Sequence, residues 1–337
     1  MTEYESTTIK EVDRKSWNHV LENSRLSTVF HTLEWIEVVT KTFNLEETLI
    51  IGREDGEPVC IFPFFKGKSY IFNIYGSPIP ETGAMYGGPL WLENREMQES
   101  IMKEFHLDRG LFTSYFLKLP PHYPTEIFKR LSYEIEPVPN FILDLNRPSE
   151  DIWNSISKKA RNSVRKAKKS GIEIVEGAYR DIQEYHQMHL ETCKRNSLNP
   201  LDLAFLRELV RGLSSRGMLK ILLAKLNDKT LSGSIFLFHK KSILYFMGDS
   251  YSEYLKLNPN DLIQWHIIET GANTGYETYD LGGAGPPGIT SFKKKWGGTE
   301  TPFYRVFKGT PVTRIFRDLY ASARRHPWVS RLFRRNL

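Results

Sequence analysis

The sequence predicts an α/β (α+β) protein built from two similar units in tandem, each a mixed, largely antiparallel sheet flanked by helices. Its 337 residues exceed what a single small core usually organises, so we expect two domains of roughly 150 residues. A plan of three short strands joined by tight turns also occurs twice, with Asp55 in the first copy matching Asp228 in the second, 173 residues later. The matched spacing favours a duplication, although similar β-meanders also arise by chance.

Strands are predicted where β-branched, aliphatic and aromatic residues run between turn residues. In the first copy they cover 49–51, 61–65 and 70–75, and in the second 221–224, 234–238 and 243–247. Apolar residues at helical spacing predict helices at 17–23 and 33–42 before the first copy, and at 149–170, 181–194 and 201–215 before the second. A helix over 260–274, between Pro259 and Gly275, leads into a strand at 279–281.

Prolines mark the expected boundary between the two units. Pro137, Pro139 and Pro148 surround a short strand predicted at 141–145. We therefore expect a first domain over 1–145, a second domain over 146–308 that carries the active site, and a basic amphipathic tail over 309–337.

The net charge of the chain is concentrated in this tail. From 311 to 337 there are seven arginines and one aspartate, a balance of +6 that equals the net charge of the whole sequence. Interleaved apolar residues such as Ile315, Phe316 and Leu319 make the segment amphipathic. A segment of this kind lies on an anionic membrane, contacts RNA or folds back on the first domain.

Composition and cysteine content indicate an ordinary cytoplasmic protein. Hydrophobic residues make up 40% and charged residues 26%, and no stretch approaches the ~20 apolar residues that span a membrane. The N-terminal residues are polar and include acids, unlike an export signal. The two cysteines, Cys60 and Cys193, and the scattered histidines predict neither a disulfide framework nor a metal site.

The helix predicted at 149–170 has two chemically different faces. Its apolar face consists of Ile152, Ile156, Ala160, Val164 and Ala167. Between 155 and 172 there are seven basic residues and no acids. A basic face of this kind binds the phosphates of a nucleic acid, a nucleotide sugar or coenzyme A, or it is simply a solvated surface. We regard Arg161 and Arg165 on this face as candidate substrate-binding residues.

The segment from 276 to 298 combines residue types suited to an anionic substrate that bears a carbonyl group. A short strand leads to Gly282 and Gly283, which allow the backbone to approach a ligand closely. A lysine cluster follows between Phe292 and Trp296. No GxGxxG follows a first strand, the glycines at 282–288 are too unspecific for a nucleotide fingerprint, and GxxxxGK[ST] and GxSxG are absent. These observations disfavour NAD binding, ATP-driven chemistry and a covalent serine nucleophile.

Five motifs resemble, in order and spacing, those of the FemAB-type acyltransferases. They are FHTLEW (30–35), YGGP (86–89), KKARNSVRKA (158–167), YDLGG (279–283) and FKxxWGG (292–298). The resemblance extends over nearly the whole chain and implies tandem copies of the GNAT N-acyltransferase fold. It also implies transfer of an activated acyl group to an amine. The best-known members take an amino acid from aminoacyl-tRNA to the peptide of a cell-wall precursor, whereas relatives use acyl-CoA donors.

The resemblance also assigns roles to individual residues. Lys293 matches the lysine of the family's Phe-Lys motif, and we expect it to stabilise the oxyanion that forms on the substrate carbonyl. The alternative is a surface lysine beside Lys294 and Lys295. Arg195 resembles an arginine that holds substrate phosphate in the family, but it would be equally at home as a charge at a helix end.

Aminolysis further requires a neutral amine, and hence a proton acceptor. Asp249 follows a predicted strand and is the candidate, acting directly or through water, with hydrogen bonds from Tyr251 or Tyr304. Deprotonation assisted by the substrate, and a purely structural Asp249 in a turn or helix cap, are the alternatives. The other candidate substrate-binding residues are Arg195, Tyr251, Gly282, Gly283, Phe292 and Trp296.

We therefore expect a cytoplasmic N-acyltransferase that transfers an acyl or aminoacyl group to an amine, such as that of a lipid-linked or nucleotide-linked cell-envelope precursor. No tightly bound cofactor is expected, and aminoacyl-tRNA or acyl-CoA would serve as co-substrate. One alternative is an acyl-CoA-dependent enzyme acting on a small amine or amino sugar. Another is a non-catalytic RNA- or membrane-binding module. Because a lipid-linked acceptor would lie at a membrane, peripheral contact of the tail with the inner membrane surface is one alternative to its folding back on the first domain, which is the commonest outcome for such a segment.

Overall fold

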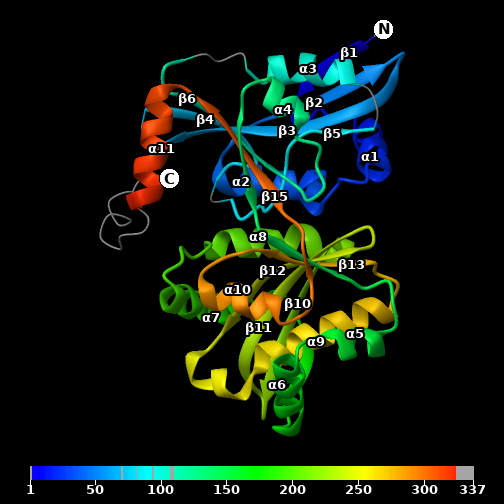
Figure 1. The fold of residues 1–337 in the computed structure, drawn as a ribbon, viewed down its shortest axis with the longest axis vertical. Coiled ribbons are helices and arrows are strands. Elements are labelled where there is room, and N and C mark those ends of the chain that lie inside the picture. The colour runs from blue at the N-terminus through cyan, green and yellow to red at the C-terminus, as the bar shows by residue number, and fades with distance from the viewer. Residues whose placement is uncertain (1, 70, 81, 93–94, 107–109, 324–337) are drawn as a thin grey trace. The chain divides into compact units, whose positions relative to one another are not determined.

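Each half of the structure is built on one sheet with helices packed against it, as Figure 1 shows. The computed structural model describes residues 2–69, 71–80, 82–92, 95–106 and 110–323. These residues form two units. The first contains the described residues of Met1–Pro137 and Phe303–Leu337, and the second is Val138–Pro302.

The sheet of the first unit has the strand order β1-β2-β3-β4-β6-β15-β7 among its described residues, and β5 pairs with β3. The strands β1 to β4 form an antiparallel meander, β4 and β6 are parallel, and β6 and β15 are antiparallel. The strands are β1 (Thr2–Thr7), β2 (Glu46–Glu54), β3 (Glu57–Ser69), β4 (Phe72–Ser77), β5 (Leu90–Trp91), β6 (Thr113–Leu119), β7 (Glu134–Val138) and β15 (Phe303–Gly309).

The sheet of the second unit repeats this plan with the order β9-β10-β11-β12-β13-β8-β14. The strands β9 to β12 are antiparallel, β12 and β13 are parallel, and β8 is antiparallel to both of its neighbours. The strands are β8 (Asn140–Asp144), β9 (Glu173–Gly177), β10 (Leu219–Leu226), β11 (Lys229–His239), β12 (Ser242–Ser250), β13 (Thr278–Gly283) and β14 (Thr299–Glu300). The predicted tandem of two largely antiparallel sheets is confirmed.

Each sheet takes one strand from the other half of the sequence. β8 follows β7 along the chain but pairs with β13 in the second sheet, and β15 follows β14 but pairs with β6 in the first. The two exchanged strands occupy the same position in their sheets, next to the strand that runs parallel to the meander. The units consequently divide at 137/138 and 302/303, whereas the expected boundaries are at 145, from the prolines, and at 308.

The offset between the two copies is 172 residues in the structure, one fewer than the sequence comparison predicts. The first hairpin pairs Glu54 with Glu57, and its counterpart pairs Leu226 with Lys229. Asp55 and Asn227, both at φ 48°, therefore occupy the same position in two-residue turns. The sequence comparison matched Asp55 to Asp228 because both are aspartates. The equivalent positions are instead set by the turn of each hairpin, which fixes the register of the two strands.

Helices cover the strands of each unit. Those of the first unit are α1 (Arg14–Asn23), α2 (Leu33–Phe43), α3 (Arg95–Glu104), α4 (Glu126–Arg130) and α11 (Pro311–Ala323). Those of the second are α5 (Ser149–Ser155), α6 (Lys158–Lys169), α7 (Ile182–Asn196), α8 (Leu203–Leu213), α9 (Pro259–Asn273) and α10 (Pro287–Lys294). β11 is buried from Thr230 to Phe238, which requires cover on both faces of the sheet, and α7 and α9 both pack against it.

The helix predicted at 149–170 is interrupted, forming α5 and α6. The backbone is extended at Ile156 (φ −70°, ψ 158°), and the Ser157 hydroxyl then accepts a hydrogen bond from the Ala160 N–H as the N-cap of α6. Ala160, Val164 and Ala167 pack in the core of the second unit, as their spacing predicts. The sequence pattern missed the break because apolar residues continue at helical spacing through it.

The described part of the C-terminal segment packs on the first unit. The Phe316 ring on α11 stacks on Phe72 with a centroid distance of 4.1 Å, and Arg314 and Arg317 form ion pairs with Glu134. The rest of the predicted tail, 324–337, lies outside the described residues. None of the described helices combines the length and the apolar character needed to cross a bilayer.

The strand exchange predicts which unit a core mutation destabilises. Val306 on β15 is buried in the first unit and Leu143 on β8 in the second. Val306→Ala should cost about 2 kcal/mol and Leu143→Ala about 3 kcal/mol of unfolding free energy. Native-state hydrogen exchange should show faster exchange of β6 amides in Val306→Ala and of β13 amides in Leu143→Ala. The opposite pattern, or equal effects on both sheets, would contradict the exchange.

Candidate active site

The parallel strands β12 and β13 pair with each other only near their beginnings. The ladder joins Ser242–Leu244 to Thr278–Asp280 and extends no further within the fully described residues 138–302. Beyond it, β12 continues along β11 and β13 continues along β8. The facing edges at the carboxyl ends of β12 and β13 thus carry backbone groups that this ladder does not use, and such groups are suited to hold an extended substrate.

A carboxylate organises the end of β13. Asp280 is buried, and its Oδ1 accepts hydrogen bonds from Asn140 Nδ2 at 3.1 Å and from the Gly282 N–H at 2.8 Å. Gly282 has φ +79°, in the left-handed region that favours glycine. The bond from Gly282 to Asp280 fixes the turn, and with it the direction of the next carbonyl group, that of Gly283.

Lys293 on α10 donates a hydrogen bond from its Nζ to this Gly283 carbonyl at 2.8 Å. Its side chain is buried, and burial lowers its pKa to about 8, although the nearby Asp280 opposes the shift. An ammonium group has three N–H donors, and the Gly283 oxygen takes one of them. The remaining donors suit an oxyanion that develops on a substrate carbonyl. The alternative of a solvent-exposed surface lysine does not hold for Lys293.

The three consecutive lysines of the motif occupy different environments. Lys294 is exposed and lies 3.9 Å from Glu300. Lys295 is paired with the buried Asp261 and lies over the Phe292 ring, 4.3 Å from its centroid. Lys293 is therefore the lysine whose charge is buried against a backbone carbonyl rather than offset by a carboxylate in direct contact.

The two aromatic residues of the motif differ in accessibility. Phe292 is half-buried and meets Trp296 edge to face, with 6.2 Å between the ring centroids. Trp296 is fully buried in the hydrophobic core of the second unit, next to the end of α10. As placed here, Trp296 supports the helix that carries Lys293, and Phe292 is the aromatic residue with exposed surface.

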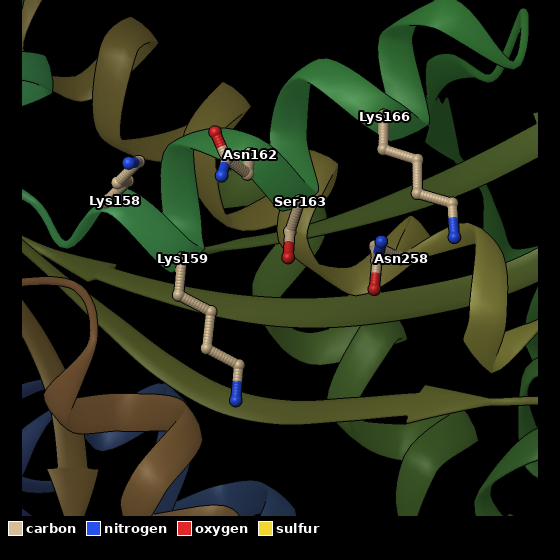
Figure 2. A pocket seen from close by; sticks show the side chains of 6 residues that line it. All are labelled: Lys158, Lys159, Asn162, Ser163, Lys166 and Asn258. Atoms are coloured by element: carbon tan, nitrogen blue, oxygen red, sulfur yellow. The ribbon is translucent and has the colours of Figure 1, made fainter.

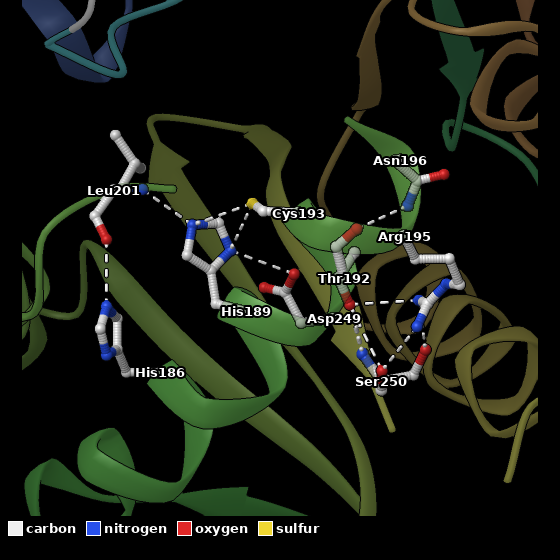
Figure 3. Close-up of polar contacts among 9 residues, drawn as sticks. All are labelled: His186, His189, Thr192, Cys193, Arg195, Asn196, Leu201, Asp249 and Ser250. Atoms are coloured by element: carbon white, nitrogen blue, oxygen red, sulfur yellow. Dashed lines mark hydrogen bonds and ion pairs between the residues drawn. The ribbon is translucent and has the colours of Figure 1, made fainter. Parts of the chain in front are cut away.

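Asp249 lies within β12 and pairs with a histidine that the sequence interpretation considered only as a metal ligand (Figure 3). His189 Nε2 lies 2.9 Å from the Leu201 nitrogen as its acceptor, and Nδ1–H donates to Asp249 Oδ1 at 3.1 Å. The Cys193 Sγ lies 3.6 Å from His189 Nε2. Asp249 is thus a buried strand residue with a structural partner, and it does not cap a helix.

The missed histidine had a signal in the sequence. His186 and His189 are three residues apart on α7, and the backbone of one residue, Leu201, contacts both: its C=O lies 3.2 Å from His186 Nε2, and its N–H bonds to His189. Spacing of this kind places both rings on one face of a helix. Their shared partner, however, depends on where the loop after α7 folds, which periodicity does not indicate.

Arg195 at the end of α7 is engaged with the end of β12 (Figure 3). Its guanidinium donates to the Ser250 carbonyl at 3.3 Å and to the Ser252 hydroxyl at 2.8 Å, and also to the Thr192 and Ser250 hydroxyls. Tyr251, the other candidate in this region, lies between these two serines, and burial together with Glu184 raises its pKa. Arg195 therefore joins α7 to β12, and its expected contact with phosphate remains a prediction.

A basic pocket of about 460 Å³ lies between α6 and the start of α9 (Figure 2). It is lined by Lys158, Lys159, Asn162, Ser163, Lys166 and Asn258. Asn258 directly precedes α9, whose N-terminus carries a partial positive charge. Three lysines and neutral polar groups, with no acidic side chain among the lining residues, suit a phosphate-bearing ligand.

The two arginines of α6 do not line this pocket. Arg161 Nη1 donates to three backbone carbonyls at the end of α5, those of Trp153, Asn154 and Ile156. Arg165 lies over the Trp153 ring, 5.5 Å from its centroid. Three of the five lysines of α6 therefore line the pocket, whereas its two arginines contact α5.

Tyr304, proposed from the sequence as a hydrogen-bonding partner, belongs to the first unit. It lies on β15, opposite Leu119 of β6. Lys293, Asp249 and the remaining candidates all lie in the second unit. In the part of the chain that the structure describes, no group of three or more His, Cys, Asp or Glu side chains is arranged to hold a metal ion.

The chain is similar in sequence to one protein family and in fold to several solved structures. The family described as "Acetyltransferase (GNAT) domain" matches residues 154–294. Among curated proteins, none is similar enough to match. The fold of FemX is similar with a TM-score of 0.70 and 14% identity, covering 89% of this chain and 96% of FemX.

Two further structures show the same fold. The C-terminal domain of a protein described as a lysylphosphatidylglycerol synthetase, from Agrobacterium fabrum, has a TM-score of 0.59 and 10% identity, covering 91% of this chain and 95% of that domain. A tandem GNAT protein from the clavulanic acid biosynthesis pathway has a TM-score of 0.56 and 8% identity, covering 91% of this chain and 98% of its own. The chain thus has the fold of two GNAT domains in tandem.

Burial of Lys293 predicts a pH dependence of stability. Its pKa is about 8 in the folded chain and 10.5 in an exposed lysine, so between these values the unfolded chain binds more protons. The unfolding free energy of the wild type, measured relative to Lys293→Met by chemical denaturation, should therefore rise from pH 8 to pH 10.5. Lys294→Met, which removes an exposed lysine of the same motif, serves as the control for loss of a lysine charge. If the difference in unfolding free energy between the wild type and Lys293→Met did not change with pH, Lys293 would be exposed to solvent.

Proposed function

We propose that the protein transfers an activated acyl or aminoacyl group to an amine, as the FemAB-type resemblance implies. The match of residues 154–294 to the GNAT acetyltransferase family and the tandem fold shared with FemX support this proposal. The coarse class, an acyltransferase of the GNAT superfamily, follows from these matches. The roles of single residues, the donor and the acceptor are our proposal.

The observation that carries the proposal is the buried Lys293 ammonium, held against the Gly283 carbonyl. When an amine attacks an ester or thioester, the carbonyl oxygen becomes an oxyanion. A donor that is already in place and shielded from water stabilises this charge by about 3 to 4 kcal/mol. With a pKa of about 8, Lys293 is mostly protonated at neutral pH, as this role requires.

For the proton of the amine we propose Asp249 as acceptor, with its position set by His189. Tyr251 is proposed to supply a hydrogen bond to the substrate. Deprotonation by the substrate itself is the alternative, because burial and the bond from His189 leave Asp249 a structural role as well. Phe292 and the backbone of Gly282 and Gly283 are proposed to contact the acyl group, with Trp296 supporting them.

The donor is proposed to bind with its phosphates in the basic pocket of α6. Aminoacyl-tRNA and acyl-CoA both carry such phosphates. An aminoacyl donor is supported by the structural neighbour described as a lysylphosphatidylglycerol synthetase, whose name specifies a lysyl group on a lipid.

As acceptor we propose a lipid-linked or nucleotide-linked amine of a cell-envelope precursor, in the cytoplasm or at the inner membrane surface. Arg161, Arg165 and Arg195 are proposed to support phosphate binding from α6 and α7.

A second candidate is an acyl-CoA-dependent enzyme that acts on a small amine or amino sugar. The structural neighbour from clavulanic acid biosynthesis favours it, since its description specifies a form without AcCoA. A non-catalytic RNA- or membrane-binding module is the third candidate. A buried lysine in the site favours catalysis over this module, because holding a charge away from water costs stability that binding alone does not require.

Donor identity and the role of Lys293 are tested together. The wild type should discharge label from one of two pools, radiolabelled aminoacyl-tRNA or radiolabelled acyl-CoA, when supplied with amine acceptors. Lys293→Met should lower turnover at least 100-fold with folding intact, since it removes the oxyanion donor. The matched control Lys294→Met should retain turnover. Discharge from CoA alone would exclude the tRNA donor, and binding without discharge of either pool would support the module.

The basic pocket predicts an effect on donor binding. Lys158→Ala combined with Lys166→Ala should raise the KM for the donor about ten-fold at low salt, and the difference should shrink as salt screens the phosphates. The control Lys169→Ala removes an exposed lysine of the same helix that does not line the pocket. Equal effects of both changes, or a loss confined to kcat, would exclude the pocket as the phosphate site.

A further inference from the structure

Four large apolar side chains in the first unit are unusually exposed. Ile71, Leu111, Ile315 and Leu319 are 63%, 58%, 62% and 64% exposed, whereas no other large apolar side chain among the described residues exceeds 41%. Single exposed apolar residues are common on protein surfaces, but a contiguous group marks an interaction site. Whether the four residues are contiguous is therefore decisive.

Ile71 and Leu111 lie in the turns that lead into two neighbouring parallel strands. β4 and β6 are parallel neighbours, with Asn73 opposite Thr113 and the Asn73 N–H bonded to the Phe112 carbonyl. Ile71 and Leu111 each lie two residues before this pair, at the end of the sheet where both strands begin.

Helix α11 brings the other two residues to the same end. The Thr310 hydroxyl donates to the Leu111 carbonyl at 2.7 Å, just before α11 begins. Phe72 contacts Phe112 and stacks on Phe316, with centroid distances of 5.6 and 4.1 Å. Figure 1 shows α11 beside β4 and β6. We call Ile71, Leu111, Ile315 and Leu319 the end-of-sheet patch.

The packing explains why these residues are exposed in a fixed arrangement. Ile71, Leu111 and Ile315 each directly precede one of the three phenylalanines. The phenylalanines point toward one another and anchor the three segments, so the preceding side chain is held outward in each case. Leu319 lies one helical turn beyond Ile315 on α11 and extends the patch.

The described charges on α11 are balanced, because its two arginines, Arg314 and Arg317, pair with Glu134 and Asp318, and it is the sequence after the helix that is basic. The sequence that follows this helix, 324–337, contains five arginines and no acidic residue. An apolar patch continued by a strongly basic segment is complementary to an anionic lipid surface, where apolar side chains enter the headgroup boundary and arginines meet phosphates.

We propose that the end-of-sheet patch docks the first unit onto an anionic lipid bilayer. This goes beyond the proposed function because it concerns the first unit and requires neither Lys293 nor a particular donor. A second copy of the chain fits the patch less well, since a two-fold contact would bring two segments of like charge together. RNA fits less well too, because aliphatic side chains offer bases neither stacking surfaces nor hydrogen bonds.

The test uses the full chain in flotation with vesicles of phosphatidylcholine, with or without about 30% phosphatidylglycerol. The wild type should float with the anionic vesicles only. Ile315→Ser combined with Leu319→Ser leaves every arginine in place and should reduce binding about ten-fold. The matched control Leu190→Ser, on a helix of the second unit where Leu190 is 38% exposed, should bind like the wild type.

Three results would overturn the proposal. The first is that the wild type does not bind the anionic vesicles. The second is that the double variant binds as well as the wild type, which would show that the basic tail alone suffices. The third is that light scattering shows a wild-type dimer and that the double variant is monomeric. Acyl transfer to a soluble amine, measured in parallel, separates this proposal from the proposed function: the double variant should retain turnover. A thermal melt confirms that both serine variants are folded.

Discussion

The pairing of β8 with β13 is the interaction on which the candidate site depends. β8 comes from the first half of the sequence, yet it completes the second sheet and brings Asn140 to Asp280, 140 residues away. Asp280, held by Asn140, in turn holds the Gly282 N–H and so sets the turn that presents the Gly283 carbonyl to Lys293. A strand exchanged between two sheets thus determines where a cation lies.

Burying that cation has an energetic cost that only a functional role or compensating contacts would offset. Lys295 illustrates the compensated case, since its charge meets Asp261 directly. Lys293 instead contacts a neutral carbonyl, and its pKa is lowered accordingly. Groups with perturbed pKa values are concentrated at active sites. A charged group that is held away from water interacts strongly with the charge that develops in a transition state.

Basic side chains have different partners in the two units. In the second unit, α6 directs lysines into a pocket and uses Arg161 and Arg165 to hold α5. The planar guanidinium of arginine suits carbonyl bonding and ring stacking, whereas the mobile ammonium of lysine suits a diffuse phosphate. In the first unit, Arg314 and Arg317 of α11 pair with Glu134 beside the exposed Ile315 and Leu319.

The sequence by itself determined the tandem organisation, most strands and helices, and the lysine motif, because turns, periodicity and short motifs are local signals. It did not determine which sheet β8 and β15 join, which of three adjacent lysines is buried, or that His189 pairs with Asp249. Those outcomes were decided by the tertiary structure, since each depends on contacts between segments distant in the chain. The break between α5 and α6 and the 172-residue offset, although local, were fixed by capping and turn geometry that residue types alone did not specify.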